Sequence, residues 1–433
     1  MSENELPYMI MDADNHFTEP PTCFEQYIDP SKKDLAVRFV QDASGQRLQL
    51  FAGKPSKYNS KQTVYSAEAL EKMLGQPLNE LAGEGKSDES VNQLIPGMLL
   101  NRMNPLKGLT EAERKELVQK FRHQSEAYGS RDLRLALMTD QGIEAALMFP
   151  AAAHDIEYEF ADNIEALYAN VRAFNRWMLE EVGYNVENRM YLPPYIPMAD
   201  PDLAVKEVER VIADGAPLIQ FKSGHAHGGE HNPWGGRSIA DPVYDGVWAR
   251  INEAKIGVTI HLGGTDYQKY GADWSYDPED TFGEFDAFQW MMYWGDRPAQ
   301  EVTAAMILHN LFGRFPNVRV CLAEMGTVWV PYTLRKMDHA FMMGRKAKYG
   351  TLKQRPSEVF RQHFVIAPYP EENVARVVEV TGVDPIVFGS DFPHGEGLAY
   401  PGKYAGQQLK GFSDEDVRKI MRGNLAKFLG LPD

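Results

Sequence analysis

The stretch "MDADNHFTEP", residues 11–20, places three chemically active side chains on alternate positions directly after an apolar run. These side chains belong to Asp12, Asp14 and His16. In an extended strand, alternate side chains share a face and lie roughly 6 to 7 Å apart along the chain. Two acids and an imidazole would therefore point the same way at the end of a buried strand, where an unpaired charge is costly. We expect this strand to lead into a functional site.

Apolar runs that end in polar or glycine residues recur along the chain, and stretches with helical periodicity separate most of them. The runs cover residues 8–17, 142–150, 189–197, 216–224, 255–264, 317–326, 363–370 and 384–396. This alternation is typical of parallel β/α units, and eight such units close a barrel. We therefore predict an α/β fold, a (β/α)8 TIM barrel, with residues 1–433 forming a single domain.

Residues 31–130 separate the first two runs by far more than one helix requires. Thr110 and Glu113 have the spacing of a capping box, which marks the start of a helix. We predict a helical insertion with loops after the first strand. Near the other end of the chain, Ser413 and Asp416 resemble the same motif and predict a closing helix.

Composition limits the classes of partner and the cellular compartment. The formal net charge of −16 argues against nucleic acid or an anionic membrane as the main partner, since both require clustered basic residues. Cys23 and Cys321 are too few for a disulfide scaffold and lack the spacing of a zinc knuckle. The sequence contains neither a recognisable signal peptide nor an apolar run of membrane-spanning length. We predict a soluble cytoplasmic protein.

Polar side chains lie at the ends of five of the eight predicted strands. Because the carboxyl ends of barrel strands meet at one mouth, we expect these side chains to converge there. A shared cation would compensate their charge, and imidazole with carboxylate suits zinc, iron or manganese. The set comprises Asp14, His16, Lys222, His261, Glu324, Asp391 and His394.

Four segments together resemble a known family. They are "DADNH" (12–16), "IHLGG" (260–264), "AEMGTVWVPYTLRKMD" (323–338) and "VFGSDFPHGEG" (387–397). The combination resembles the amidohydrolase superfamily, in particular the branch that includes aminocarboxymuconate semialdehyde decarboxylase and resorcylate decarboxylase. The resemblance implies a (β/α)8 barrel that holds a divalent metal ion.

The resemblance also implies roles for individual residues. The acid-x-His pair of the family falls on Asp14 and His16, the fifth-strand ligand on His261, and the eighth-strand ligand on Asp391. Asp391 is also expected to carry the proton, because a carboxylate beside a metal can accept one from bound water. Asp12 matches an upstream acid that orients a ligand.

Glu324 departs from the family pattern, because many decarboxylating relatives have a histidine after the sixth strand. Three roles stay open for it: metal ligand, general acid or base, and structural acceptor for loop amides. His394, three residues after Asp391, is a further catalytic candidate. With Glu324 in place, the mechanism of those relatives does not transfer directly.

Three functions therefore stay open. The first is a metal-dependent enzyme that hydrolyses or non-oxidatively decarboxylates a small organic substrate, with zinc as the expected single ion. The second is a monooxygenase with a dinuclear iron or manganese centre, because the acidic ligand set has room for two ions. The third is a non-catalytic partner subunit.

Other residues allow two interpretations. Lys222 is either a carboxylated bridge between metals or, as burial favours, an ordinary paired lysine. His225, His227 and His231 lie in a glycine-rich loop and are either solvated or in contact with a substrate, and His309 belongs to a helix.

The aromatic-rich loop at 265–296 is expected to shape a pocket for a flat substrate or to form a subunit interface. The family resemblance suggests a homo-oligomer, with a hetero-oligomer containing a related subunit as the alternative.

Overall fold

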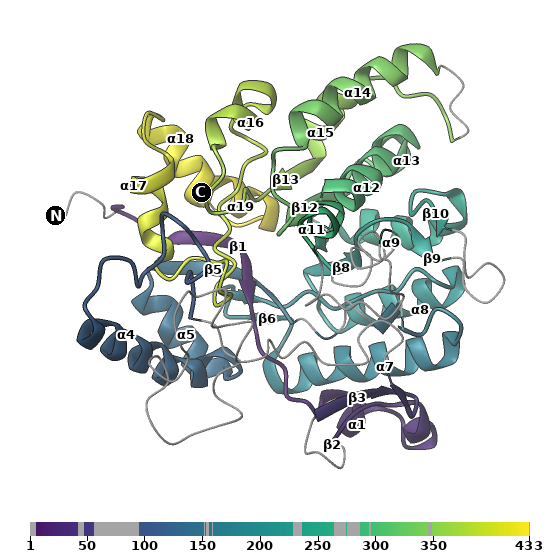
Figure 1. The fold of residues 1–433 in the computed structure, drawn as a ribbon. Helices are drawn as coiled ribbons and strands as arrows, with labels where there is room; N and C mark the ends of the chain where they lie inside the picture. Colours follow the sequence, from purple (N-terminus) through teal and green to yellow (C-terminus); the bar gives the residue numbers. More distant parts are fainter. Residues whose placement is uncertain are drawn as a thin grey trace.

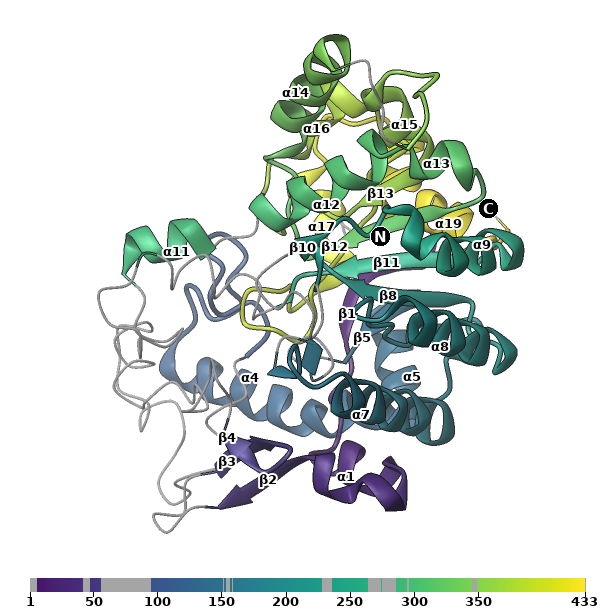
Figure 2. The same cartoon turned by 90° about the vertical axis from the view of Figure 1, so that its right-hand side faces the viewer.

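Most of the parallel strands lie in the middle of the molecule with helices around them, whereas a small antiparallel sheet lies at its edge (Figures 1 and 2). The structure is a computed structural model. It describes residues 6–41, 47–55, 95–150, 152, 156–157, 159–227, 236–263, 274, 286–293, 296–344 and 349–432.

Two four-stranded sheets contain the parallel strands, and one of them has a short antiparallel strand at its edge. In the first sheet, β1 (Ile10–His16), β5 (Ile143–Phe149) and β7 (Met190–Tyr191) are parallel, and the short β6 (Asn185–Val186) is antiparallel at its edge. The second sheet contains β8 (Leu218–Lys222), β11 (Gly257–His261), β12 (Arg319–Ala323) and β13 (Phe364–Ile366), all parallel. The predicted α/β class with parallel strands is confirmed.

Two predicted strands are shorter or less regular than expected. The run 189–197 forms a strand only at β7, and Tyr195 then makes a single bridge with Gln220. The run 384–396 forms no regular strand and has two isolated β-bridges, Ile366–Ile386 and Asn15–Phe392. Prolines inside both runs explain the difference, because proline cannot donate to a strand ladder.

Helices follow the strands as the periodicity predicted. Asn163 caps α7 (Ile164–Trp177) by accepting a bond from Ala166 N. Asp200 caps α8 (Pro201–Ala213) in the same way. The other long helices are α5 (Arg131–Asp140), α9 (Asp245–Ala254), α12 (Asp296–Leu308), α14 (Val330–Met343), α15 (Pro356–His363) and α16 (Val374–Thr381).

The closing helix is present but interrupted. Ser413 caps α18 (Asp414–Arg418) by accepting from Asp416 N, as predicted. One π-helical turn, Lys419–Gly423, then leads into α19 (Asn424–Leu429).

The insertion after β1 is mixed rather than only helical. Its described part contains the antiparallel strands β2 (Val37–Gln41), β3 (Arg47–Phe51) and β4 (Lys54–Pro55), which the sequence analysis did not predict. The predicted capping box is present at the start of α4 (Glu111–Gln124), where Thr110 and Glu113 bond each other's backbone. Residues 42–46 and 56–94 lie outside the described residues.

Both faces of the strands are buried, which explains why their sequences read as continuous apolar runs. Met11 and Ala13 of β1 pack with Ala145 and Leu147 of β5 in one apolar cluster. Side chains from the intervening positions, such as Met148, pack in a second cluster with residues from the helices. The strand ends are consequently held on a rigid frame.

Two further sequence-based expectations bear on the fold. Cys23 and Cys321 are both free thiols in the core, so neither forms a disulfide. Among the described residues, no helix combines the length and the apolar character needed to cross a membrane.

Candidate metal centre

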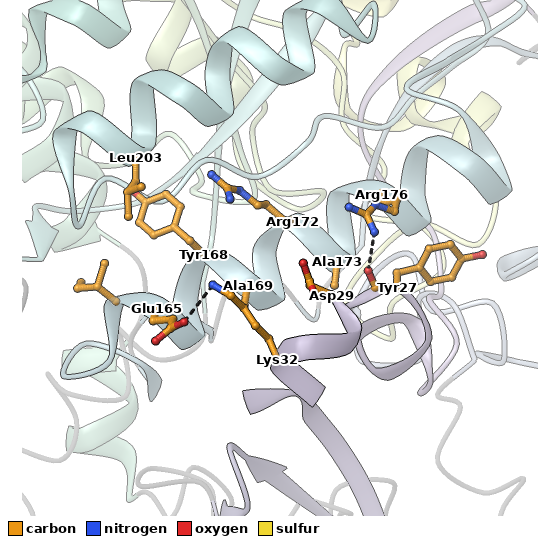
Figure 3. A pocket seen from close by; sticks show the side chains of 11 residues that line it. Tyr27, Asp29, Lys32, Glu165, Tyr168, Ala169, Arg172, Ala173, Arg176 and Leu203 are labelled. Carbon is orange, nitrogen blue, oxygen red and sulfur yellow. Dashed lines mark hydrogen bonds and ion pairs between the residues drawn. The ribbon is translucent and has the colours of Figure 1, made fainter. Parts of the chain in front are cut away.

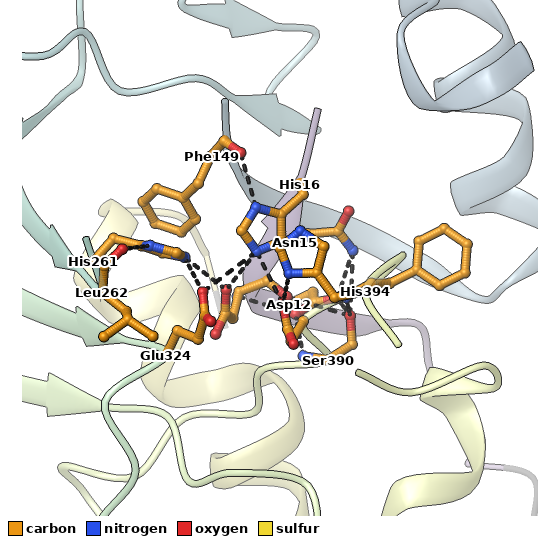
Figure 4. Close-up of polar contacts among 12 residues, drawn as sticks. Asp12, Asn15, His16, Phe149, His261, Leu262, Glu324, Ser390 and His394 are labelled. Carbon is orange, nitrogen blue, oxygen red and sulfur yellow. Dashed lines mark hydrogen bonds and ion pairs between the residues drawn. The ribbon is translucent and has the colours of Figure 1, made fainter. Parts of the chain in front are cut away.

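Six side chains singled out in the sequence meet at the carboxyl ends of the strands (Figure 4). Asp14, His16, His261 and Glu324 each offer one ligand atom within 4.8 Å of the others. A second group that meets the same limit shares two members with the first and consists of His16, Glu324, Asp391 and His394. The predicted convergence is therefore present.

Short distances join the imidazole rings to the carboxylates. His16 Nε2 lies 3.0 Å from Asp391 Oδ1, 3.7 Å from Asp14 Oδ1 and 3.8 Å from Glu324 Oε2. His261 Nε2 lies 3.1 Å from Glu324 Oε2 and 3.4 Å from Asp14 Oδ1. The two Nε2 atoms thus face one cluster of carboxylate oxygens.

The other ring nitrogens fix the tautomer of both histidines. His16 Nδ1 lies 3.0 Å from the carbonyl oxygen of Phe149, and His261 Nδ1 lies 2.8 Å from that of Leu262. Since a carbonyl oxygen only accepts, Nδ1 carries the hydrogen in each ring, and a neutral ring then presents a lone pair at Nε2. Histidines that bind metals are oriented in this way.

Burial makes the charged forms of the acids in this cluster unfavourable. It raises the pKa of Asp14 to about 7 and that of Asp391 to about 8. Burial, followed by repulsion from Asp391 and Asp14, raises the pKa of Glu324 well above its usual value. Burial also lowers the pKa of His261 to about 3, so that ring is neutral. A cation between these groups would compensate the carboxylates.

The donor set fits a divalent transition metal. Asp14 Oδ1 is buried and accepts no hydrogen bond from the described residues. It faces the lone pair of His261 Nε2, and two such acceptors repel each other unless a cation or a proton lies between them. Imidazole and carboxylate ligands suit zinc, iron and manganese.

His394 differs from the other members because it is partly exposed. Its ring stacks on His16 with centroids 3.8 Å apart, and its Nδ1 lies 2.7 Å from Asp391 Oδ1. Burial alone would lower the pKa of His394, but the charge of Asp391 beside it raises the pKa to about 9. The side chain is 37% exposed and so connects Asp391 to solvent.

Two of the acids lie on unusual backbone. Glu324 has φ 52° and Asp391 has φ 54°, which is the left-handed region that few residues other than glycine adopt. Such conformations concentrate at functional sites, where the surrounding structure holds them in place. Each acid follows its strand segment directly, so this turn of the backbone helps to direct the carboxylate into the cluster.

Asp12 lies beside the cluster rather than in it. Its carboxylate accepts bonds from Ser390 N at 2.9 Å, Ser390 Oγ at 2.5 Å, Asn15 Nδ2 at 2.8 Å and Asp14 N at 3.1 Å. The side chains of Asp12, Asp14 and His16 therefore do not all point to one face of β1, contrary to the prediction. The register of β1 shifts between Asp12 and Asn15, which breaks the alternation.

Three polar residues next to the cluster were not predicted from the sequence. Asn15 and Ser390 adjoin the predicted ligands in sequence and could have been found from that adjacency. Arg134 lies within α5, and no sequence pattern around it marks it as part of the site. It is nevertheless buried and donates to the backbone oxygen of His16 at 2.7 Å.

Several other residues singled out in the sequence are not members of either group of candidate ligands. Lys222 is buried at the end of β8, in register with His261. His225 Nδ1 lies 3.1 Å from the carbonyl oxygen of its neighbour Ala226. His309 follows α12 and lies 2.8 Å from Ser238 Oγ, as expected for a residue outside the site. The side chain of His227 and the whole of His231 lie outside the described residues.

Most of the aromatic loop at 265–296 lies outside the described residues. Trp274 and Phe288 are described, with 58% and 47% of their areas exposed, and their rings meet edge to face at 5.2 Å. Phe288 belongs to α11 (Ala287–Tyr293). Whether this loop covers a substrate or a partner stays a prediction.

A separate pocket of about 390 Å³ lies beside α7 (Figure 3). Lys32 and Glu165 form an ion pair of 3.1 Å at its edge, and Arg176 donates to the carbonyl oxygen of Tyr27 at 3.2 Å. None of the residues in the two metal groups lines this pocket. The candidate metal centre is a distinct site.

Comparison with known proteins places the chain in a family. The family model for amidohydrolases matches residues 122–431, more than half of the chain. The chain also aligns with the solved structure of an amidohydrolase from Mycobacterium avium subsp. paratuberculosis, with a TM-score of 0.77 and 30% identity, covering 98% of this chain and 100% of the other. The chain belongs to the amidohydrolase family.

Two curated relatives are decarboxylases. A 2-amino-3-carboxymuconate-6-semialdehyde decarboxylase from Dictyostelium discoideum is 24% identical over 54% of this chain and only 60% of its own length. A gamma-resorcylate decarboxylase from Polaromonas sp. is 22% identical over 68% of this chain and 85% of its own length. The branch suggested by the sequence motifs is confirmed.

A solved decarboxylase has a similar fold. The dihydroxybenzoic acid decarboxylase from Polaromonas sp., with bound manganese and 2-nitroresorcinol, aligns with a TM-score of 0.53 and 19% identity over 76% of this chain and 92% of its own. None of these relatives gives specific support to hydrolysis, and none favours the oxygenase or the non-catalytic subunit.

Proposed function

We propose that this chain is a divalent-metal-dependent carboxy-lyase that removes carbon dioxide from a small aromatic acid without oxidation. The observation that carries the proposal is the convergence of two histidine Nε2 atoms with two buried carboxylates and one partly buried carboxylate, at distances of 3.0 to 3.4 Å. The decarboxylase relatives give the reaction class, and the manganese in a related structure makes that ion the first to test.

The ligands of the ion would be Asp14, His16, His261 and Asp391, with Glu324 as a fifth. Glu324 is assigned as a ligand because its Oε2 lies 3.1 Å from His261 Nε2, in the same cluster. A bound divalent ion would polarise the substrate and stabilise the negative charge that develops as the carboxylate leaves. The carboxylate of Asp12 would orient Asp14 by accepting a hydrogen bond from the backbone N–H of Asp14.

The chain's own acids and imidazoles would supply the proton. Decarboxylation breaks a carbon–carbon bond and leaves its electron pair on the substrate carbon, which must then take up a proton as carbon dioxide departs. Asp391 is the donor in this proposal, and its proton is replaced through His394, which lies 2.7 Å away and reaches solvent. General acid catalysis of this kind contributes roughly 10² to 10⁴ in rate.

The fold expected for such an enzyme is a closed barrel. Single bridges join Tyr195 to Gln220, Ile366 to Ile386 and Asn15 to Phe392, which would connect the two sheets and the segment 384–396 into one ring. The backbone bond from Ala13 N to Phe388 O, 2.8 Å long, supports the same closure. The single domain, the extent of the insertion and a homo-oligomeric state are part of this proposal.

Release of carbon dioxide from a panel of aromatic acids, measured with Mn²⁺-loaded protein, tests the proposal. The panel should contain hydroxybenzoates with a carboxylate next to a hydroxyl group, and aminocarboxymuconate-type acids. Asp391→Asn should abolish turnover, whereas Asp384→Asn, an exposed acid in the same segment, should not change it.

Full turnover in Asp391→Asn would remove that residue from the mechanism. If no acid in the panel releases carbon dioxide although the ion is bound, the carboxy-lyase assignment is wrong. Consumption of oxygen with substrate would then indicate the oxygenase.

A further inference from the structure

A buried arginine lies directly behind the metal centre. Arg134 projects from α5 and is completely buried, although its guanidinium stays charged in proteins. The rings of Phe392 and Tyr128 lie 5.0 and 5.6 Å from its guanidinium carbon and meet each other edge to face. Its Nε and Nη1 atoms find no acceptor among the described residues, so this side of the group is enclosed by aromatic rings.

The other side of the guanidinium makes directed hydrogen bonds. Nη2 donates to Asn15 Oδ1 and, at 2.7 Å, to the backbone oxygen of His16. The backbone oxygen of Phe392 lies 3.5 Å from the same atom. One nitrogen therefore touches both β1 and the segment 384–396, immediately beside His16 and Asp391.

Asn15 connects this arginine to a buried carboxylate. While its Oδ1 accepts from Arg134, its Nδ2 donates to Asp12 Oδ2 at 2.8 Å (Figure 4). Asp12 in turn accepts from Ser390 N and from Asp14 N. Arg134 and Asp12 are thus opposite buried charges joined through one amide.

Each contact in this network adjoins a candidate ligand of the metal. On β1 the network contacts Asp14 N and the backbone oxygen of His16. On the segment 384–396 it contacts Ser390 and Phe392, the two neighbours of Asp391 in sequence. A buried charged pair contributes little net stability compared with apolar packing of the same volume. Stability alone therefore does not account for this network.

We infer that Arg134 is a positioning residue, which acts through Asn15 and Asp12 to set the spacing between His16 and Asp391. The inference deepens the proposed function, since it rests on the metal centre proposed there. Removal of the guanidinium should release the two segments from each other. Groups that orient metal ligands typically contribute about 10- to 100-fold in affinity.

The test is a titration of the full-length protein with Mn²⁺, with free ion measured by electron paramagnetic resonance. Arg134→Met, which keeps the length but loses the donors, should bind Mn²⁺ about 10- to 100-fold more weakly. Arg134→Lys, which keeps one charged donor, should recover part of the affinity. Asn15→Leu should weaken binding similarly, and adding Arg134→Met to it should cause little further loss, because both act in one network.

Arg422→Met is the matched control. Arg422 also pairs with an acid, donating to Glu144 at 2.7 and 2.9 Å, but Glu144 lies near the opposite end of β5. This variant should lose thermal stability and keep its Mn²⁺ affinity.

Unchanged Mn²⁺ affinity in Arg134→Met or in Asn15→Leu would overturn the inference and leave the proposed function intact. If Arg134→Met does not fold, Arg134→Lys and Asn15→Leu decide the question by the same criterion. Failure of the unaltered protein to bind Mn²⁺ would instead contradict the metal centre itself, and with it both proposals.

Discussion

The side chains of His16 and Asp391 meet with Nε2 and Oδ1 3.0 Å apart, although they belong to the first and the last strand-like segments of the chain. The backbone joins the same two segments, because Asp391 N donates to Asp14 O at 2.7 Å and His16 N donates to Phe392 O at 2.8 Å. The candidate metal centre thus includes the contact between the two ends of the fold.

Metal removal should lower the stability of the protein. An ion that binds only the folded chain stabilises it by about 2.7 kcal/mol when present at about 100 times its Kd. We expect a chelator to lower the melting temperature and Mn²⁺ to restore it. The double variant His16→Ala/His261→Ala should show no such response. Equal melting temperatures of the unaltered protein with chelator and with Mn²⁺ would contradict a bound ion.

Glu324→Gln should distinguish the three roles that the sequence left open. The change keeps the size of the side chain and removes its charge. If Glu324 is a ligand, Mn²⁺ affinity should fall at least roughly tenfold, or about 1.4 kcal/mol. Titration of Glu396→Gln, an exposed acid nearby, serves as the control. If the variant binds Mn²⁺ with full affinity but turns over slowly, Glu324 acts as a general acid or base. If only the stability of the protein falls, Glu324 has a structural role.

Gly397→Ala should damage the site because the position has no room for a methyl group. A Cβ atom at Gly397 would lie 2.1 Å from the backbone oxygen of Asp391, and backbone cannot move aside as a flexible side chain can. We expect a stability loss of roughly 1 to 3 kcal/mol, typical of overpacking, together with weaker Mn²⁺ binding. At Gly402, by contrast, the nearest atom is 3.7 Å away, so Gly402→Ala should be tolerated in both assays. Equal behaviour of the two variants would show that the backbone of Asp391 is free to shift.

Glu207→Ala should destabilise the fold without affecting the metal. This completely buried carboxylate accepts from Arg210 at 2.6 Å, Asn175 at 2.9 Å and Arg172 at 3.3 Å. Breaking a buried pair costs roughly 3 to 5 kcal/mol, because the partner charges remain. Denaturant unfolding measures this loss. Asp214→Ala, which removes a half-exposed partner of Arg210, should cost at most about 1 kcal/mol.

The sequence alone predicted which residues would form most of the candidate metal centre. Polar residues such as Asp14, His261 and Glu324 follow apolar runs, and parallel strands bring their carboxyl ends to one edge whatever their distance along the chain. Helix starts were equally readable at Thr110 and Ser413, because capping depends on side chains within a few residues of each other.

Tertiary structure decided the features that depend on residues far apart in sequence. No local pattern shows that Arg134 reaches β1, that Glu324 and Asp391 adopt left-handed backbone, or that the insertion contains a small antiparallel sheet. The register shift in β1 that turns Asp12 away from the cluster belongs to the same class. A strand or helix signal is local, whereas these arrangements are set by packing against segments hundreds of residues away. The amino-acid sequence therefore determined which side chains are candidate metal ligands, and only the folded chain determined how they are held.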